Sequence, residues 1–125
     1  MSRQAGGQVL VADQPFDARE REFIRREFGV HFGQPSYLAD GILLRSWRSG
    51  PEKNQPKLPA AVRSMIERGL VELRSGQRGV RGFFTEAGIA AVRQLVADRH
   101  LMNPTTFAHL RLELGLDEPE ETAAK

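Results

Sequence analysis

The sequence predicts a mostly helical α+β fold, and three observations lead to this prediction. Residues 58–68 carry apolar side chains at helical spacing, residues 71–84 alternate around a glycine-rich turn as two strands would, and residues 85–99 return to helical spacing. The chain has 125 residues, a length that suits one domain. We therefore expect a single domain in which helices flank a β-hairpin.

Composition narrows the class of protein further. Hydrophobic residues make up 40% of the chain and charged residues 27%, which is typical of a globular domain. No apolar stretch is long enough to cross a membrane, and no long apolar segment follows Arg3 as it would in a signal peptide. We therefore expect a cytoplasmic protein with no membrane partner. The absence of cysteine excludes disulfides and zinc–thiolate sites.

The first helix is predicted over about 17–28. Asp17 is a good N-cap, and Glu20 stands three residues later, as in a capping box. Gly29 supplies the stop signal. Residues 1–14 precede this helix, and we expect them to form a flexible N-terminal arm because they are mostly small and polar.

The segment 36–48 is ambiguous between helix and strand. Apolar residues fit helical spacing roughly, but the Asp40-Gly41 pair weakens a helix. We favour a helix for the first half and a strand for the second half. The following residues 50–57 contain two prolines, a glycine and an asparagine, which predicts a loop.

The helix predicted over 58–68 has the clearest pattern in the chain. Pro59 suits its first turn, and Gly69 suits a left-handed position just after its end. Leu70 would then complete a Schellman cap. One buried stripe is expected from Leu58, Ala61, Val62, Met65 and Ile66.

A hairpin and two helices are predicted after Gly69. Residues 71–84 form the hairpin, Thr85 caps a helix that runs to about Arg99, and a last helix starts at Asn103 and ends at Gly115. The alternation in residues 109–114 also permits a strand. The folded domain would thus cover 15–115, and residues 116–125 would be a disordered acidic tail.

Two motifs around the hairpin resemble a known family. Residues 65–71 read Met-Ile-Glu-Arg-Gly-Leu-Val and residues 84–88 read Phe-Thr-Glu-Ala-Gly. This arrangement over residues 58–99 resembles the second half of a winged helix-turn-helix domain of the broad MarR/PadR type. The resemblance implies a recognition helix at 58–68, a wing at 71–84 and transcriptional regulation. Residues 50–57 are longer than the usual helix-turn-helix connection of about three or four residues, and the wing lacks the Asp-x-Arg often seen in MarR proteins.

The resemblance implies binding of duplex DNA through the helix and the wing. Between Arg45 and Arg81 the sequence has nine Lys/Arg against three Asp/Glu, so the basic excess falls on these elements. Gly76, Gly79 and Gly82 would let the wing backbone approach phosphates. The residues expected to contact DNA are Lys53, Lys57, Arg63, Ser64, Arg68, Arg74, Arg78 and Arg81.

The same fold also permits functions other than DNA binding. Winged helices also serve as protein–protein interaction modules, which is the main alternative, and RNA binding is a further one. The chain has no nucleophile elbow, phosphate loop or His-Glu-x-x-His motif, so we expect no enzyme. The three histidines lack the spacing of a helical metal site, and no cofactor is expected.

A homodimer is the expected assembly, because winged regulators commonly dimerise through terminal helices. The last predicted helix carries an apolar stripe that could form the seam. In the alternative arrangement, the same stripe folds back on the first helix and completes the core of one chain. The stripe consists of Phe107, Leu110 and Leu114.

Overall fold

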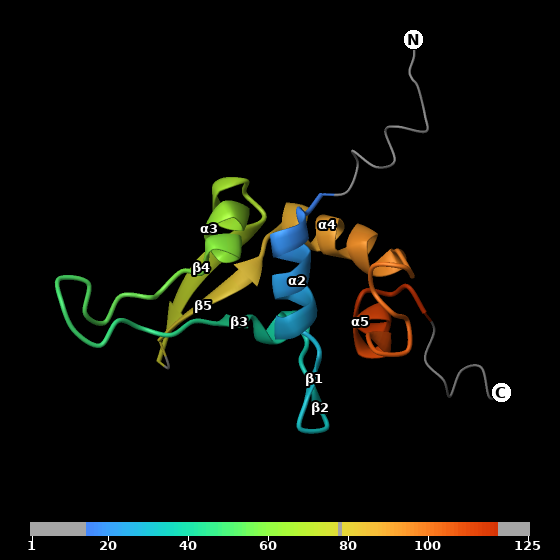
Figure 1. Cartoon of the computed structure of the whole chain (residues 1–125), viewed down its shortest axis with the longest axis horizontal. Coiled ribbons are helices and arrows are strands. Elements are labelled where there is room, and N and C mark those ends of the chain that lie inside the picture. Colours follow the sequence, from blue (N-terminus) through green and yellow to red (C-terminus); the bar gives the residue numbers. More distant parts are fainter. Residues whose placement is uncertain (1–14, 78, 118–125) are drawn as a thin grey trace, which may run out of the picture.

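The structure is a computed structural model, and it describes residues 15–77 and 79–117. Within this range, four α-helices and two small antiparallel sheets confirm the α+β class (Figure 1). The elements follow in the order α2 (Ala18–Glu27), β1 (Val30–His31), β2 (Gln34–Pro35), η1 (Leu38–Asp40, a 3-10 helix), β3 (Ile42–Leu43), α3 (Ala60–Glu67), β4 (Val71–Gly76), β5 (Gly79–Phe84), α4 (Glu86–Ala97) and α5 (Ala108–Glu113).

Helix α2 begins where the capping signal predicts. The backbone N–H of Glu20 donates to the Asp17 carboxylate at 2.8 Å, and the Asp17 N–H donates to Oε1 of Glu20 at 2.9 Å. Both bonds satisfy amides that the first turn of a helix leaves unpaired. The start of the helix is therefore fixed by its own sequence.

The larger sheet has the strand order β3–β5–β4 and is antiparallel throughout. Val71 pairs with Phe84 at the end of the wing nearest the core, and Gly76 pairs with Gly79 at its tip. The inner face carries Phe84, whose ring lies 6.5 Å from that of Phe16 and 5.9 Å from that of Phe28. The core thus lies between this face of the sheet and the helices.

The junction between α3, the hairpin and α4 is held by backbone contacts. Gly69 has φ +77°, and the Leu70 N–H donates to the carbonyl of Met65 at 2.9 Å, which confirms the Schellman cap. The hydroxyl of Thr85 donates to the Gly69 carbonyl and accepts from the Gly88 N–H. A Cβ atom at Gly88 would lie 1.9 Å from the Leu70 carbonyl oxygen, so only glycine fits there. The Gly-Leu-Val and Thr-Glu-Ala-Gly motifs are therefore parts of one structural joint.

The segment 36–48 divides as predicted, into the short helix η1 and strand β3, although η1 is a single 3-10 turn. Residues 45–57, which we call the finger, follow β3. Its two limbs pair through the Trp47 N–H and the Gln55 carbonyl at 2.9 Å and through the Lys57 N–H and the Arg45 carbonyl at 2.7 Å. No helix forms in the described residues 44–59, which confirms the loop predicted at 50–57, and η1 is the one helical turn between α2 and α3 in the described part of the chain.

The last helix completes the core of this chain. Phe107, Leu110 and Leu114 are 6%, 0% and 7% exposed, so the expected dimer seam through these side chains is wrong. Residues 109–113 are helical, which excludes the strand alternative. Leu116 packs against the core and Asp117 pairs with Arg111, so the ordered contacts reach beyond the predicted boundary at 115. The expected arm 1–14 and most of the expected tail, 118–125, lie outside the described residues.

Candidate nucleic-acid interface

Two of the residues predicted to contact DNA instead donate hydrogen bonds to a buried carboxylate. Glu20 on α2 is 1% exposed, and its carboxylate accepts hydrogen bonds from the Ser64 hydroxyl and from the Arg68 guanidinium. Arg68 also donates to the carbonyl of Pro15 at 2.7 Å. A buried carboxylate is tolerated only when it is paired and hydrogen-bonded. Ser64 and Arg68 therefore join α3 to α2.

The outward face of α3 is less basic than the sequence indicates. Ala60, Arg63 and Glu67 are the exposed residues within this helix. Arg63 is the single cation among them, and Glu67 would repel a phosphate. With Ser64 and Arg68 engaged at α2, this helix offers one side chain suited to reading a base edge.

The wing arginines lie together on the outer face of the sheet. Arg74 and Arg81 are direct cross-strand partners. Arg74 pairs with Glu72 at 2.6 Å, and its guanidinium lies 4.5 Å from the centre of the Phe83 ring. Arg81 donates to the Asp40 carbonyl at 3.0 Å. Arg74 is thus partly neutralised, whereas Arg81 forms no salt bridge among the described residues.

Arg78 and the three glycines of the wing were also expected to lie near phosphates. Arg78 lies outside the described residues. Gly76 and Gly79 are exposed at the tip, where a phosphate has access to the backbone. Gly82 is buried, and a Cβ atom there would lie 3.3 Å from a methyl carbon of Val71. Its expected role in approaching phosphates is therefore wrong, because it serves packing within the sheet.

The finger carries two more exposed cations than the two residues predicted to contact DNA from it. Lys53 and Lys57 are exposed on it, and so are Arg45 and Arg48, which were not among the residues predicted to contact DNA. The ammonium group of Lys57 lies 4.8 Å from the centre of the Trp47 ring. Within the described part of the chain, no salt bridge engages any of these four cations. The excess of Lys/Arg that begins at Arg45 in the sequence was the signal for the two missed arginines.

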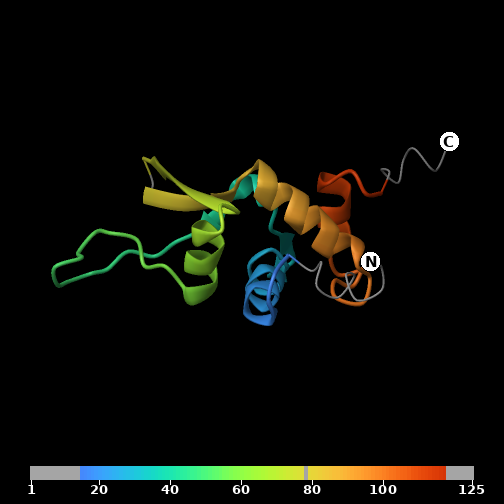
Figure 2. The ribbon, with the colours of Figure 1, turned by 90° about the horizontal axis from the view of Figure 1, so that it is seen from above.

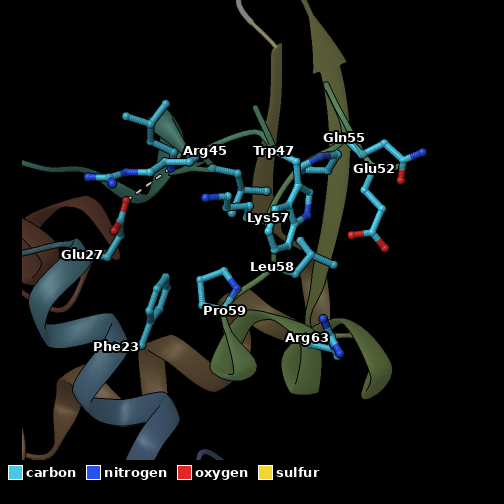
Figure 3. Close-up of a pocket in the computed structure, with 13 residues that line it drawn as sticks. Phe23, Glu27, Arg45, Trp47, Glu52, Gln55, Lys57, Leu58, Pro59 and Arg63 are labelled. Atoms are coloured by element: carbon cyan, nitrogen blue, oxygen red, sulfur yellow. Dashed lines mark hydrogen bonds between the residues drawn. The ribbon is translucent and has the colours of Figure 1, made fainter. Parts of the chain in front are cut away.

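A groove of about 650 Å³ lies between the finger, α2 and the start of α3 (Figure 3). Phe23 reaches into it from α2, Trp47 and Lys57 reach in from the finger, and Pro59 precedes α3 at its floor. Its basic lining residues are Arg45, Lys57 and Arg63, and its acidic ones are Glu27 and Glu52.

The finger and the wing project from the same end of the molecule. Figure 1 shows both extending away from α4 and α5, and in the view from above in Figure 2 both point to the same side, with α3 next to the base of the finger. The structure therefore brings Lys53, Lys57 and Arg63 to one end. Arg81 lines a second groove together with Arg45, so it belongs to the same region.

Comparisons with known proteins give no match to a protein-family model, a curated protein or a solved structure. In the described part of the chain, none of the helices combines the length and the apolar character needed to cross a membrane. Residues 15–77 and 79–117 also contain no group of three His, Asp or Glu side chains arranged to hold a metal ion.

Proposed function

We propose that this chain is a cytoplasmic DNA-binding protein of the winged-helix type, acting as a small transcriptional regulator. The observation that carries the proposal is the set of cations without ion-pair partners at one end of the described structure. The finger supplies Arg45, Lys53 and Lys57, and α3 supplies Arg63. A cluster of this kind attracts a polyanion because none of the four cations forms a salt bridge in the described structure, although Glu27 and Glu52 share the groove lining.

The topology supports the same proposal. A strand that precedes α3 pairs with the second strand of the following hairpin, in the order β3–β5–β4. A winged-helix domain places a helix and a hairpin next to each other in this way, so that both meet one duplex. The finger lies between β3 and α3 in the chain, so its cations can contact phosphates of a duplex that meets α3.

The distribution of charge indicates mainly phosphate contacts. Contacts to phosphates fix position and orientation, whereas contacts to base edges provide specificity. The finger cations and Arg81 are suited to the first role. Arg63 is the described residue best suited to the second, since it lies on the outward face of α3.

Fluorescence anisotropy with a random duplex pool tests the proposal. We expect binding that weakens with salt, with a log–log slope of about −0.9 for each phosphate neutralised. Lys57→Gln and Arg81→Gln should each flatten the slope by about one unit, whereas the same change at Arg93, exposed on α4, should leave the slope unchanged. No binding at low salt would overturn the proposal.

One observation favours a second candidate, a protein-interaction module. Leu43 and Trp47 line the groove and are 63% and 42% exposed, and exposed apolar groups of this size also suit a protein partner. If the protein fails to bind DNA and a stable complex with one protein partner is lost on Leu43→Asp, this candidate replaces DNA binding.

A further inference from the structure

A second groove, of about 780 Å³, continues the first one along the molecule. It runs between the β1–β2 hairpin and the edge of the sheet. The two grooves share Phe23, Glu27, Leu43 and Arg45 in their linings, so they meet at the junction of α2 with β3. We call these two adjoining grooves the channel; together their linings extend from the tip of the β1–β2 hairpin to the finger.

Three exposed aromatic side chains line this channel. Trp47 stands on the finger, Tyr37 precedes η1, and Phe32 forms the tip of the β1–β2 hairpin; they are 42%, 39% and 103% exposed. Phe32 is a non-glycine residue with φ +53°, a conformation that bulky side chains rarely adopt. Such a position has a cost of the order of 1–3 kcal/mol and is typical of functional sites.

Cations share these linings with the aromatic side chains. Arg45 and Arg81 line the groove that contains Phe32 and Tyr37, and Lys57 lies over the Trp47 ring in the other groove. The carboxylate of Glu27 is also in the lining, but it accepts a hydrogen bond from the Leu43 N–H at 3.3 Å. Counted over both linings, the basic residues are Arg26, Arg45, Lys57, Arg63 and Arg81, and the acidic ones are Glu27, Asp40 and Glu52.

We propose that this channel binds an unpaired nucleic-acid strand, whose bases stack on Trp47, Tyr37 and Phe32 while its phosphates face Arg45, Lys57 and Arg81. A groove that combines cations for the backbone with aromatic side chains for the bases is how proteins hold single strands without reading their sequence. A duplex hides its base faces within its own stack, so these aromatic groups suit a strand that is melted or unpaired. This inference rests on the proposed affinity for nucleic acid. It shares Arg45, Lys57 and Arg81 with the proposed duplex surface but assigns them a different ligand, an unpaired strand that also contacts the aromatic side chains.

Trp47 is the single tryptophan of the chain, so its fluorescence reports on the channel directly. The full chain is titrated with a 12-nucleotide oligo-dT, with a duplex of the same length, and with polyglutamate, at a salt concentration that suppresses weak binding. We expect oligo-dT to quench Trp47 strongly and saturably, and the duplex and polyglutamate to quench it much less. Equal quenching by polyglutamate would overturn the proposal, because the channel would then bind any polyanion or an acidic protein segment.

Substitutions separate stacking from charge. Phe32→Ala and Tyr37→Ala should each weaken binding of fluorescein-labelled oligo-dT by about five-fold or more, since stacking contributes about 1–3 kcal/mol per base. Both variants should bind duplex as the unmodified chain does. Leu112→Ala, which removes an exposed apolar side chain on α5, is the matched control and should change neither affinity.

The outcomes distinguish this inference from the proposed function. Binding of duplex without quenching by oligo-dT overturns the single-strand channel and leaves the duplex proposal intact. Quenching by oligo-dT without duplex binding supports the single-strand channel and overturns the duplex proposal. If Phe32→Ala and Tyr37→Ala both leave oligo-dT affinity unchanged, the stacking assignment is wrong.

Discussion

The two sides of α3 use arginine in opposite ways. On the side that faces α2, Arg68 pairs with Glu20, a carboxylate that is 1% exposed. On the outward side, Arg63 has no ion-pair partner in the described structure and lines the groove below the finger. The two residues are five positions apart and have the same side chain. The end of α3 is therefore a joint to α2, whereas its outward side is a candidate binding surface.

The same contrast extends over the whole molecule. The α2–α3–α4 side contains the Schellman cap, the Thr85 joint and the buried Glu20 network. In all three, polar groups form hydrogen bonds within the protein. The side formed by the finger and the channel leaves aromatic and cationic groups exposed. We therefore expect substitutions on the first side to change stability and substitutions on the second side to change binding.

The largest effect should come from the core under α3. Met65 is fully buried, and Met65→Ala should lower the free energy of unfolding by about 2–5 kcal/mol because it removes packed atoms and leaves a cavity. Leu43→Ala, at a side chain that is 63% exposed in the groove, should change it by less than about 0.5 kcal/mol. Urea denaturation measures both. Similar losses in the two variants would remove the distinction between core and groove.

The buried network should give the next effect. Glu20→Ala removes the acceptor of Ser64 and Arg68 and also half of the capping box, so we expect a loss of about 2–4 kcal/mol. The control is Glu22→Ala on the same helix, where a solvent-exposed pair with Arg25 is lost at a cost of about 0.5 kcal/mol or less. A tolerated Glu20→Ala would mean that α2 docks on α3 by apolar contacts alone.

A smaller effect is expected at the end of α3. Gly69 has φ +77°, and a β-branched side chain fits that conformation poorly. Gly69→Val should therefore lower the free energy of unfolding by more than about 1 kcal/mol, and Gly69→Asn by less, since asparagine tolerates the left-handed region. Thermal denaturation of the pair checks this order, and an unchanged melting temperature in Gly69→Val contradicts it.

The smallest effect concerns Asp117. The hydrogen bond from Arg111, together with the charges of Arg111 and Arg99, lowers the pKa of this carboxyl despite a smaller opposing effect of desolvation. A lowered pKa in the folded state means stabilisation that is present above the unfolded pKa and is lost as the pH falls through the folded pKa. The stability difference between the unmodified chain and Asp117→Asn should thus be present at pH 7 and shrink below a pH of about 4. Denaturant titrations at pH 7, 4 and 3 measure this difference, and one that is the same at all three would exclude the pairing as its source.

Sequence patterns predicted the elements that depend on neighbouring residues. The Asp17 capping box, the Gly69 cap and the hairpin at 71–84 each involve residues within a short stretch of chain, so local chemistry is enough to locate them. The wing register follows from the same alternation that predicted its strands.

The features that the sequence did not reveal depend on distant contacts. Nothing near Ser64 or Arg68 indicates that Glu20, more than forty residues earlier, would take both. The finger has no apolar periodicity, so its paired limbs and its proximity to α3 could not be predicted. For the last helix, an apolar stripe shows that Leu110 must be covered but not what covers it.

The paired variants Arg63→Ala and Arg68→Ala test the central contrast most directly, with unfolding and random-duplex binding measured on both, the binding at a temperature where each is folded. We expect Arg68→Ala to lose about 2–3 kcal/mol of stability, since a buried carboxylate loses its charged partner, and to keep the duplex affinity and salt slope of the unmodified chain. Arg63→Ala should unfold within about 0.5 kcal/mol of the unmodified chain and bind duplex more weakly, with a flatter salt slope. The opposite pattern, with Arg68→Ala impaired in binding and Arg63→Ala impaired in folding, would contradict the division of α3 into a joint and a binding surface.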